Sequence, residues 1–136
     1  MDIKKLAVAE TGRLHLRAAD DELIYADGKQ EKPIVVNVYG PGSKQYARAM
    51  AAQNNRMLDK LKKRGKADQT AEQKAQEAAE FLADCTESFE NIDYDKLTGR
   101  ELALAVYSDA GLGFIADQVS AFIGNWANFT KPSTKG

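Results

Sequence analysis

The spacing of apolar residues along the chain changes near residue 40. Before it the period is two, since Leu14 and Leu16 flank a polar residue, and this alternation is typical of a half-buried strand. A second short apolar run covers residues 23–25 and is followed by an Asp-Gly turn signal. Residues 34–39 then form the most β-prone stretch of the chain. We therefore expect residues 1–39 to form a small antiparallel β-sheet.

From Ser43 onward the apolar residues recur at helical spacing. Ser43 follows a Gly-Pro-Gly turn and can cap the first helix. Capping boxes, in which a Thr and a Glu or Gln three residues later exchange hydrogen bonds, are predicted at Thr70 and Thr98. The apolar stripe of the helix that begins at Thr70 is expected to continue through Cys85 to Phe89.

The last helix has the strongest amphipathic pattern in the chain. Its large apolar residues are expected to be mostly buried, namely Ile115, Val119, Phe122 and Trp126. Residues 43–129 are predicted to be helical, and residues 130–136 to form a loose polar tail. The fold class expected for residues 1–136 is a single α+β domain, with a small N-terminal antiparallel β-sheet followed by about four α-helices.

The amino-acid composition says more about the possible partners of the chain than about its fold. Lys and Arg number 19 against 20 Asp and Glu, which gives a formal net charge of −1. This balance creates no overall field that would attract nucleic acid or an acidic membrane surface, so neither is expected as a partner. No apolar run approaches the length of a membrane span, and no signal peptide is recognised near Met1. The single cysteine fits a reducing cytoplasm.

Candidate catalytic groups are few. His15 is the only histidine, and strand alternation predicts that its side chain points into solvent. Cys85 lies on an apolar helical stripe and is expected to be a small buried hydrophobe. Residues 40–44 lack the glycine spacing of a phosphate-binding loop, and neither a calcium loop nor a Cys/His cluster is present. We expect no enzymatic activity, no catalytic residue, no metal and no cofactor.

Two segments of opposite charge are candidates for partner contacts. A basic run covers residues 60–66, and residues 84–95 contain acidic residues but no basic ones. Such patches permit head-to-tail self-association or contacts with another protein, and ordinary solvated surface is the alternative. The basic run has no interleaved aromatic residue, which disfavours a nucleic-acid site. The charged candidates are Lys62, Lys63, Arg64, Asp84, Glu87 and Glu90.

A thin apolar stripe on the helix after Ser43 supplies the remaining candidates. Methionine side chains are unbranched and adapt to irregular partners, and an amphipathic client helix docks through anchors at helical spacing. The alternative is that this stripe simply packs on the sheet. The stripe consists of Tyr46, Met50, Met57 and Leu61.

The order of these features matches a known pattern. The N-terminal half has a short strand set, an Asp-Gly turn, a β-rich run and a Gly-Pro-Gly-Ser passage into a helix with Tyr46. In the C-terminal half the matching segments are residues 81–92, 97–103 and 112–119, followed by Phe129. Together they resemble the tail assembly chaperones of long-tailed (siphovirus-type) bacteriophages over nearly the whole chain. The chain departs from many members at Phe89, where they carry a Trp.

The resemblance implies a binding protein. Members of this family bind the tape measure protein, a long, aggregation-prone helical chain, and keep it soluble while tail tube subunits assemble around it. They are commonly made in two forms, the longer by programmed ribosomal frameshifting, and this chain has the size of the shorter form. The expected partners are the tape measure protein, the tail tube protein, the frameshifted longer form and further copies of the chain. The expected location is the cytoplasm of the infected bacterial host, and the protein is expected to be absent from the mature virion.

Two other functions remain open from the sequence. One is a structural virion component, such as a head–tail connector or a tail-completion protein, which composition does not separate from a chaperone. The other is a DNA-binding regulator that uses the basic residues 60–66, which the near-neutral net charge disfavours.

Overall fold

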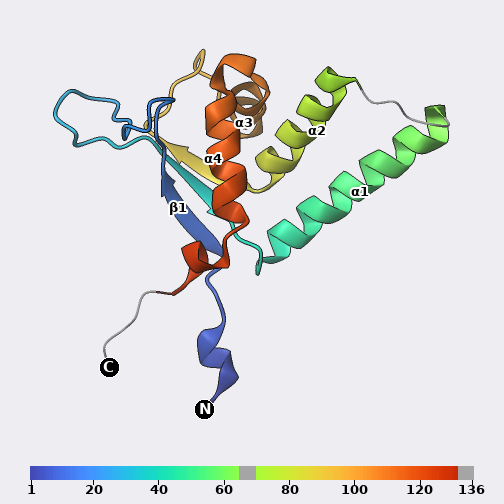
Figure 1. The fold of residues 1–136 in the computed structure, drawn as a ribbon, viewed down its shortest axis with the longest axis horizontal. Helices are drawn as coiled ribbons and strands as arrows, with labels where there is room; N and C mark the ends of the chain where they lie inside the picture. The colour runs from blue at the N-terminus through green and yellow to red at the C-terminus, as the bar shows by residue number, and fades with distance from the viewer. Residues whose placement is uncertain (65–69, 132–136) are drawn as a thin grey trace.

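The computed structural model describes residues 1–64 and 70–131, and it confirms the α+β class. A three-stranded antiparallel sheet packs against helices that cover one of its faces (Figure 1). The strands are β1 (Thr11–His15), β2 (Val35–Tyr39) and β3 (Thr86–Glu90). The α-helices are α1 (Lys44–Arg64), α2 (Ala71–Asp84), α3 (Gly99–Ser108) and α4 (Gly113–Ile123). Short 3-10 helices are η1 (Ile3–Leu6), η2 (Ala110–Leu112) and η3 (Trp126–Phe129).

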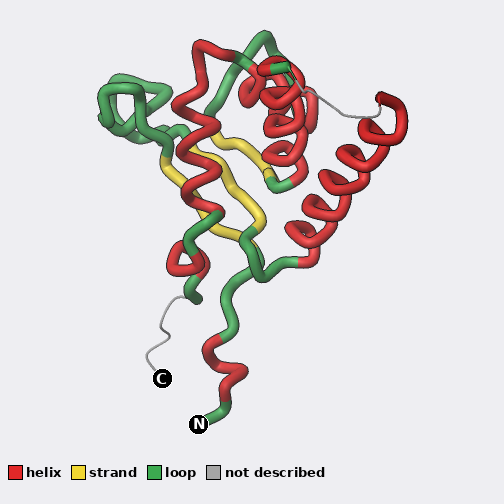
Figure 2. Tube along the Cα trace, turned by 45° about the vertical axis from the view of Figure 1, so that its right-hand side comes forward, coloured by secondary structure: helices red, strands yellow, loops and turns green. Residues whose placement is uncertain are grey.

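The sheet is not confined to the N-terminal part, which corrects the predicted division at residue 40. β2 is the central strand, with β1 on one side and β3 on the other. Helix α2 ends at Asp84, so the apolar stripe does not continue as helix to Phe89. Phe89 instead lies opposite Val36 in the β2–β3 ladder, where long-range pairing overrides the local helical pattern. The second half of the chain therefore contributes a strand as well as helices (Figure 2).

The segment between β1 and β2 forms a folded loop rather than a further strand. Its apolar run, residues 23–25, makes only the isolated bridges Arg17–Leu23 and Tyr25–Pro33. The carboxylate of Asp27 accepts hydrogen bonds from the backbone N–H groups of residues 31 and 32 and closes the turn. The loop is thus fixed by local hydrogen bonds at the end of the sheet.

Two of the three predicted helix caps form. The Ser43 hydroxyl accepts from the N–H of Tyr46 at 3.1 Å and donates to the carbonyl of Gly40 at 2.7 Å, so it joins strand end to helix start. Thr70 makes the full capping box predicted for α2. Thr98 makes no side-chain cap, because Gly99 follows it with a φ of 57° and turns the chain differently. The capping box predicted there is wrong.

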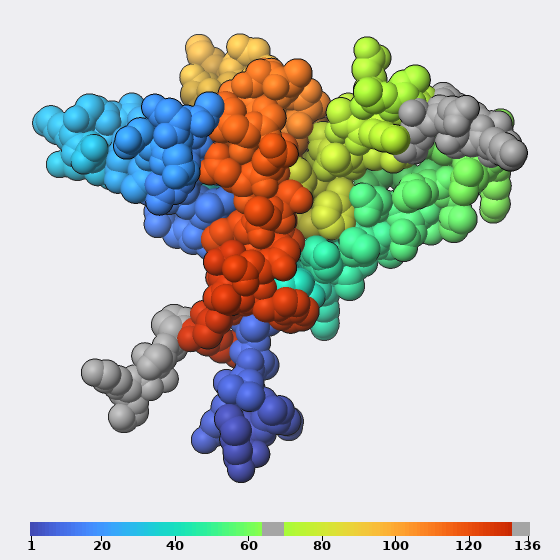
Figure 3. Space-filling view, in the orientation of Figure 1, coloured from blue at the N-terminus to red at the C-terminus, as the bar shows by residue number. Residues whose placement is uncertain are grey.

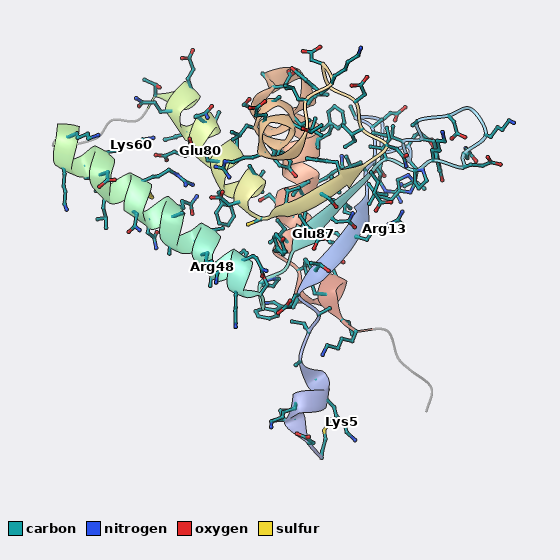
Figure 4. All side chains as sticks on the ribbon, turned by 180° about the vertical axis from the view of Figure 1, so that it is seen from behind. Lys5, Arg13, Arg48, Lys60, Glu80 and Glu87 are labelled. Carbon is teal, nitrogen blue, oxygen red and sulfur yellow. The ribbon has the colours of Figure 1, made fainter. Side chains whose placement is uncertain are left out.

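The core lies between the inner face of the sheet and helices α2, α3 and α4. It includes Val36 and Val38 of the sheet, Leu82, Val106 and Val119 of the helices. The opposite face of the sheet, seen from behind in Figure 4, carries polar side chains in its middle, whereas Val35 on the same face is buried. There Arg13 and Asn37 donate hydrogen bonds to the carboxylate of Glu90, which links all three strands.

The C-terminal end of the fold is closed by one aromatic ring. Phe129 is 1% exposed and lies directly over Gly12 of β1 and Gly40, which follows β2. A Cβ on Gly12 would lie 2.7 Å from Cε1 of Phe129, and one on Gly40 would lie 2.6 Å from its Cγ. The Phe129 carbonyl also accepts from the N–H of Ala9 at 2.7 Å. Only residues without a side chain allow the ring to approach this closely.

The predicted core positions near this end are partly correct. Ile115 and Val119 are buried, and Phe122 is partly buried with its ring 5.5 Å from that of Phe129. Trp126 is 56% exposed, so its assignment to the core is wrong. Helix α4 ends at Ile123, and the change to a 3-10 turn rotates Trp126 outward and Phe129 inward. Of the predicted loose tail, residues 132–136 lie outside the described part of the chain.

The two aromatic residues of η3 are expected to contribute very differently to stability. Phe129→Ala should lower the free energy of unfolding by about 3–5 kcal/mol, because it removes a buried ring and leaves a cavity. Trp126→Ala should cost less than about 1 kcal/mol, because the indole is mostly exposed. Urea unfolding of both variants measures this difference, and equal losses would contradict the packing described for Phe129.

Candidate partner-binding surface on helix α1

Helix α1 stands away from the sheet and packs mainly against α2. With 21 residues it is the longest helix described, and at 1.5 Å per residue it is about 30 Å long. The two helices form an antiparallel hairpin that projects from the body of the protein (Figures 1 and 3). The alternative in which the apolar stripe of α1 packs on the sheet is therefore wrong.

The contact between α1 and α2 is largely ionic. Lys60 Nζ lies 2.6 Å from Glu77 Oε1, and Arg56 Nε lies 2.9 Å from Glu80 Oε2. Arg56 also lies 3.6 Å from the carboxylate of Asp84 through Nη1. These groups are only partly exposed, so water screens them less than it screens surface pairs. We call this contact the ionic seam.

The contact between α1 and α2 is apolar only near the start of α1. The rings of Tyr46 and Phe81 meet edge to face with centroids 5.9 Å apart, and Ala49 is 2% exposed. Tyr46 is thus engaged within the protein, and it is the member of the predicted stripe that is least available to a partner. Beyond this point charged side chains occupy the side of α1 that faces α2.

The remaining apolar residues of α1 are left in contact with solvent. Residues 50, 57 and 61 share one face of a helix, because they are separated by seven and four positions. The large apolar side chains on this part of the surface are Met50, Met57, Leu58 and Leu61, which are 38%, 46%, 54% and 47% exposed. We call them the apolar stripe. Leu58 shares the helical spacing of these residues in the sequence, and it extends the surface beyond the predicted candidate set.

The acidic candidates do not form one patch on a helix. Asp84 ends α2 and is paired with Arg56 and Arg100. Glu90 lies on β3, where hydrogen bonds from Arg13 and then Asn37 hold the pKa of its carboxyl below the ordinary value. Glu87 lies on the same strand, and its side chain is exposed (Figure 4). They were grouped because residues 84–95 contain no basic residue, and in the structure Asp84 lies on α2 whereas Glu87 and Glu90 lie on β3.

The basic candidates lie at the far end of α1. Lys62 and Lys63 are exposed in the last turn of the helix. Arg64 is its last residue, and its side chain is outside the part that the structure describes, as are residues 65 and 66 of the basic run. Lys60 belongs to the ionic seam and not to an exposed patch.

His15 is partly buried, which corrects its predicted exposure to solvent. Its Nε2 lies 2.8 Å from the carbonyl oxygen of Ile24, so this nitrogen carries the proton and donates. The imidazole also meets the ring of Tyr25 edge on, with centroids 4.9 Å apart. The loop between β1 and β2 folds back over this side chain, and strand alternation alone does not reveal that cover.

Cys85 is fully buried, as predicted. Burial, and secondly the charge of Asp84, raises the pKa of its thiol to about 12. The thiol is therefore protonated at neutral pH and is a poor nucleophile. Among the described residues, no group of three or more His, Cys, Asp or Glu side chains is placed to hold a metal ion.

A cleft of about 550 Å³ lies between the open edge of β3 and the start of α3. It mixes apolar and charged side chains, and it was not predicted because it exists only where residues 86–90 form a strand. Its principal lining residues are Asp84, Glu87, Phe89, Leu97, Arg100 and Leu102.

Comparisons with known protein families, with curated proteins and with solved structures found no match to this chain. In the part of the chain that the structure describes, no helix combines the length and the apolar character needed to cross a membrane.

The burial of Cys85 predicts both its reactivity and a pH dependence of stability. Iodoacetamide should label the thiol far more slowly in the folded protein than in urea, because the folded state holds it protonated and covered. Its folded pKa of about 12 exceeds the ordinary 9.0, so its contribution to stability is complete below pH 9.0 and is lost as the pH rises toward 12. Equal labelling rates in both states would contradict this environment.

Proposed function

We propose that this chain is a tail assembly chaperone of a long-tailed (siphovirus-type) bacteriophage, in its shorter form, and that it acts without enzymatic chemistry. It binds the tape measure protein and keeps it soluble while tail tube subunits assemble. The observation that carries this proposal is the apolar stripe on α1, which a projecting helix exposes instead of burying. The family resemblance of the sequence supports the same function.

The stripe has the properties that a site for an amphipathic client helix needs. Its anchors recur along about three turns of α1, which matches the period at which an amphipathic helix presents its own apolar residues. Two of the four side chains are methionines, whose flexible thioethers pack against clients of varied shape. A long client with many similar helical segments can therefore be held at several places by the same surface.

The limited size of the stripe favours reversible binding. Its four side chains already bury roughly half of their surface in the free protein, so a client can cover only what remains. Interfaces of this kind fall well below the area of permanent complexes. Weak binding suits a chaperone, because the tail tube protein has to replace it on the client as the tube grows.

The other parts of the proposal follow from the same role. The partners are the tape measure protein, the tail tube protein and the frameshifted longer form, which would share this surface. The protein acts in the cytoplasm of the infected bacterium and is absent from the mature virion. A head–tail connector or tail-completion protein would instead remain in the particle, so mass spectrometry of purified virions separates the two roles.

Substitutions in the apolar stripe should weaken client binding without unfolding the protein. Met57→Ser with Leu61→Ser should weaken capture of the co-expressed tape measure protein by about tenfold or more, because exposed apolar anchors are removed. Thermal stability should change little, since both side chains are about half exposed. Pull-down and the soluble fraction of the client are the measurements.

The N-terminal arm offers a matched control. Ile3→Ser with Leu6→Ser removes two exposed apolar side chains of similar size from η1, far from the stripe, and should leave client capture unchanged. If both double variants bind the client equally well, the stripe is not the client site. If the unmodified protein leaves the client insoluble, the chaperone role itself is wrong.

A further inference from the structure

Strand β3 lies at the edge of the sheet, and its outer side is unpaired. The sheet order is β1-β2-β3, so β3 pairs only with β2 in the part of the chain that the structure describes. An edge strand presents backbone N–H and C=O groups that a further extended chain can hydrogen-bond. The cleft of about 550 Å³ separates this edge from the start of α3. Binding sites for small ligands span about 300–1,000 Å³, so the cleft is large enough to take several side chains of a docked segment.

The floor of the cleft is apolar and is held in place by the core. Phe89, Ile92 and Leu97 are partly buried and pack against the core cluster. Leu102 is 7% exposed and Ala103 is 2% exposed, so α3 contributes buried side chains to the same floor. Because these side chains are already ordered, a segment that docks on them does not have to order them first.

One acidic side chain of the cleft has no counter-charge. The charged residues that line the cleft are Asp84, Glu87 and Arg100. Asp84 and Arg100 pair with each other, and Asp84 also lies 3.6 Å from Arg56. Glu87 is exposed, and no ion pair joins it to another residue within the described ranges. The cleft therefore offers one uncompensated negative charge beside its apolar floor.

A β-bulge places Glu87 at the cleft. In the β2–β3 ladder, Thr86 and Ser88 lie opposite consecutive residues of β2, so Glu87 between them has no partner strand residue. A bulge interrupts the alternation of side chains between the two faces and re-aims the side chain of the extra residue. Glu87 accordingly lines the cleft together with both of its neighbours. A charge on an edge strand also discourages unselective pairing with other strands.

We propose that β3 binds an extended segment of another protein, which adds to the sheet as a fourth strand. The backbone of the segment pairs with the open edge of β3, and every second side chain enters the cleft because strand side chains alternate between faces. The segment carries apolar side chains at these positions and a Lys or Arg where it meets Glu87. This site is separate from the client site proposed on α1, because it takes an extended chain instead of a helix.

A second copy of this chain fits the edge poorly. Two β3 strands placed edge to edge would bring two Glu87 side chains into one interface, where like charges repel. At the other edge of the sheet, the guanidinium of Arg13 could meet Glu87, but it is already bonded to Glu90. A basic segment of a different protein meets neither obstacle.

A synthetic peptide tests this contact without the tape measure protein, so the result does not depend on the proposed function. The probe is the peptide Thr-Val-Thr-Lys-Thr-Leu-Thr, which has about the length of an ordinary strand and places its Lys between two apolar residues on one face. In an NMR titration of the isotope-labelled full chain, the backbone amide signals of residues 86–90 and 99–103 should shift. No shift at about 1 mM peptide, or shifts confined to α1, overturns the proposal.

Charge exchange tests the role of Glu87. Glu87→Lys should weaken binding of the peptide by about tenfold, because an attraction becomes a repulsion, and a peptide with Glu in place of Lys should regain that loss on the variant. The matched control is Glu101→Lys, which reverses an exposed charge in the first turn of α3 outside the cleft lining and should bind as the unmodified chain does. Equal affinities of the two variants for the Lys peptide overturn the proposal. Glu87 is exposed, and the amide spectrum of the variant shows whether it retains the fold.

Methylation of the peptide backbone tests whether the segment pairs as a strand. Alternate N–H groups of a strand point to the same neighbouring strand. Of two peptides methylated on alternate sets of nitrogens, one should lose binding by about tenfold or more, and the other should bind as the unmodified peptide does. If the two methylated peptides bind alike, the segment does not pair with β3 and the proposal is wrong. If the signals of residues 86–90 broaden with protein concentration in the absence of peptide, a second copy occupies the edge, and the proposal is again wrong.

Discussion

The pairing of β3 with β2 fixes the position of every helix that follows the first. Val36 and Phe89 lie opposite each other in this ladder, and Phe89 in turn meets the ring of Tyr107 on α3 with centroids 6.0 Å apart. Because β3 begins two residues after α2 ends, α2 has to leave from the edge of the sheet. The hairpin of α1 and α2 therefore extends outward beyond the core. The exposed surface of α1 therefore depends on the pairing of two strands that lie before and after the hairpin in the sequence.

The sequence was most informative where local chemistry decides the structure. The strand period, the Ser43 and Thr70 caps and the inward direction of Val119 depend on neighbouring residues, and they were predicted. The strand at residues 86–90, the cover over His15 and the outward turn of Trp126 depend on distant contacts, and they were not. The same holds for the candidate surface. Helical spacing identified Met50, Met57 and Leu61 as one face, but whether that face meets the sheet or solvent depends on where the hairpin lies.

Three sides of helix α1 make three different kinds of interaction. One side carries Arg56 and Lys60 into the ionic seam, a second exposes the apolar stripe, and a third exposes cations. An apolar seam would have required the methionines and leucines to face α2, which would leave none for a partner. Ion pairs hold the hairpin while the apolar residues remain free. This arrangement sacrifices some stability, because partly buried ion pairs contribute less than packed apolar side chains.

The ring of Phe129 over Gly12 and Gly40 has a consequence for the order of events during synthesis. β1 and β2 leave the ribosome early, whereas the residue that covers their glycines is translated more than a hundred positions after Gly12. Until Phe129 emerges, the two strands can pair, but the apolar surface around the glycines stays uncovered and the N–H of Ala9 has no carbonyl to bind. The nascent chain thus reaches its final compactness only after residue 129 has been translated, and on a ribosome that stalls earlier the apolar surface around the two glycines stays uncovered.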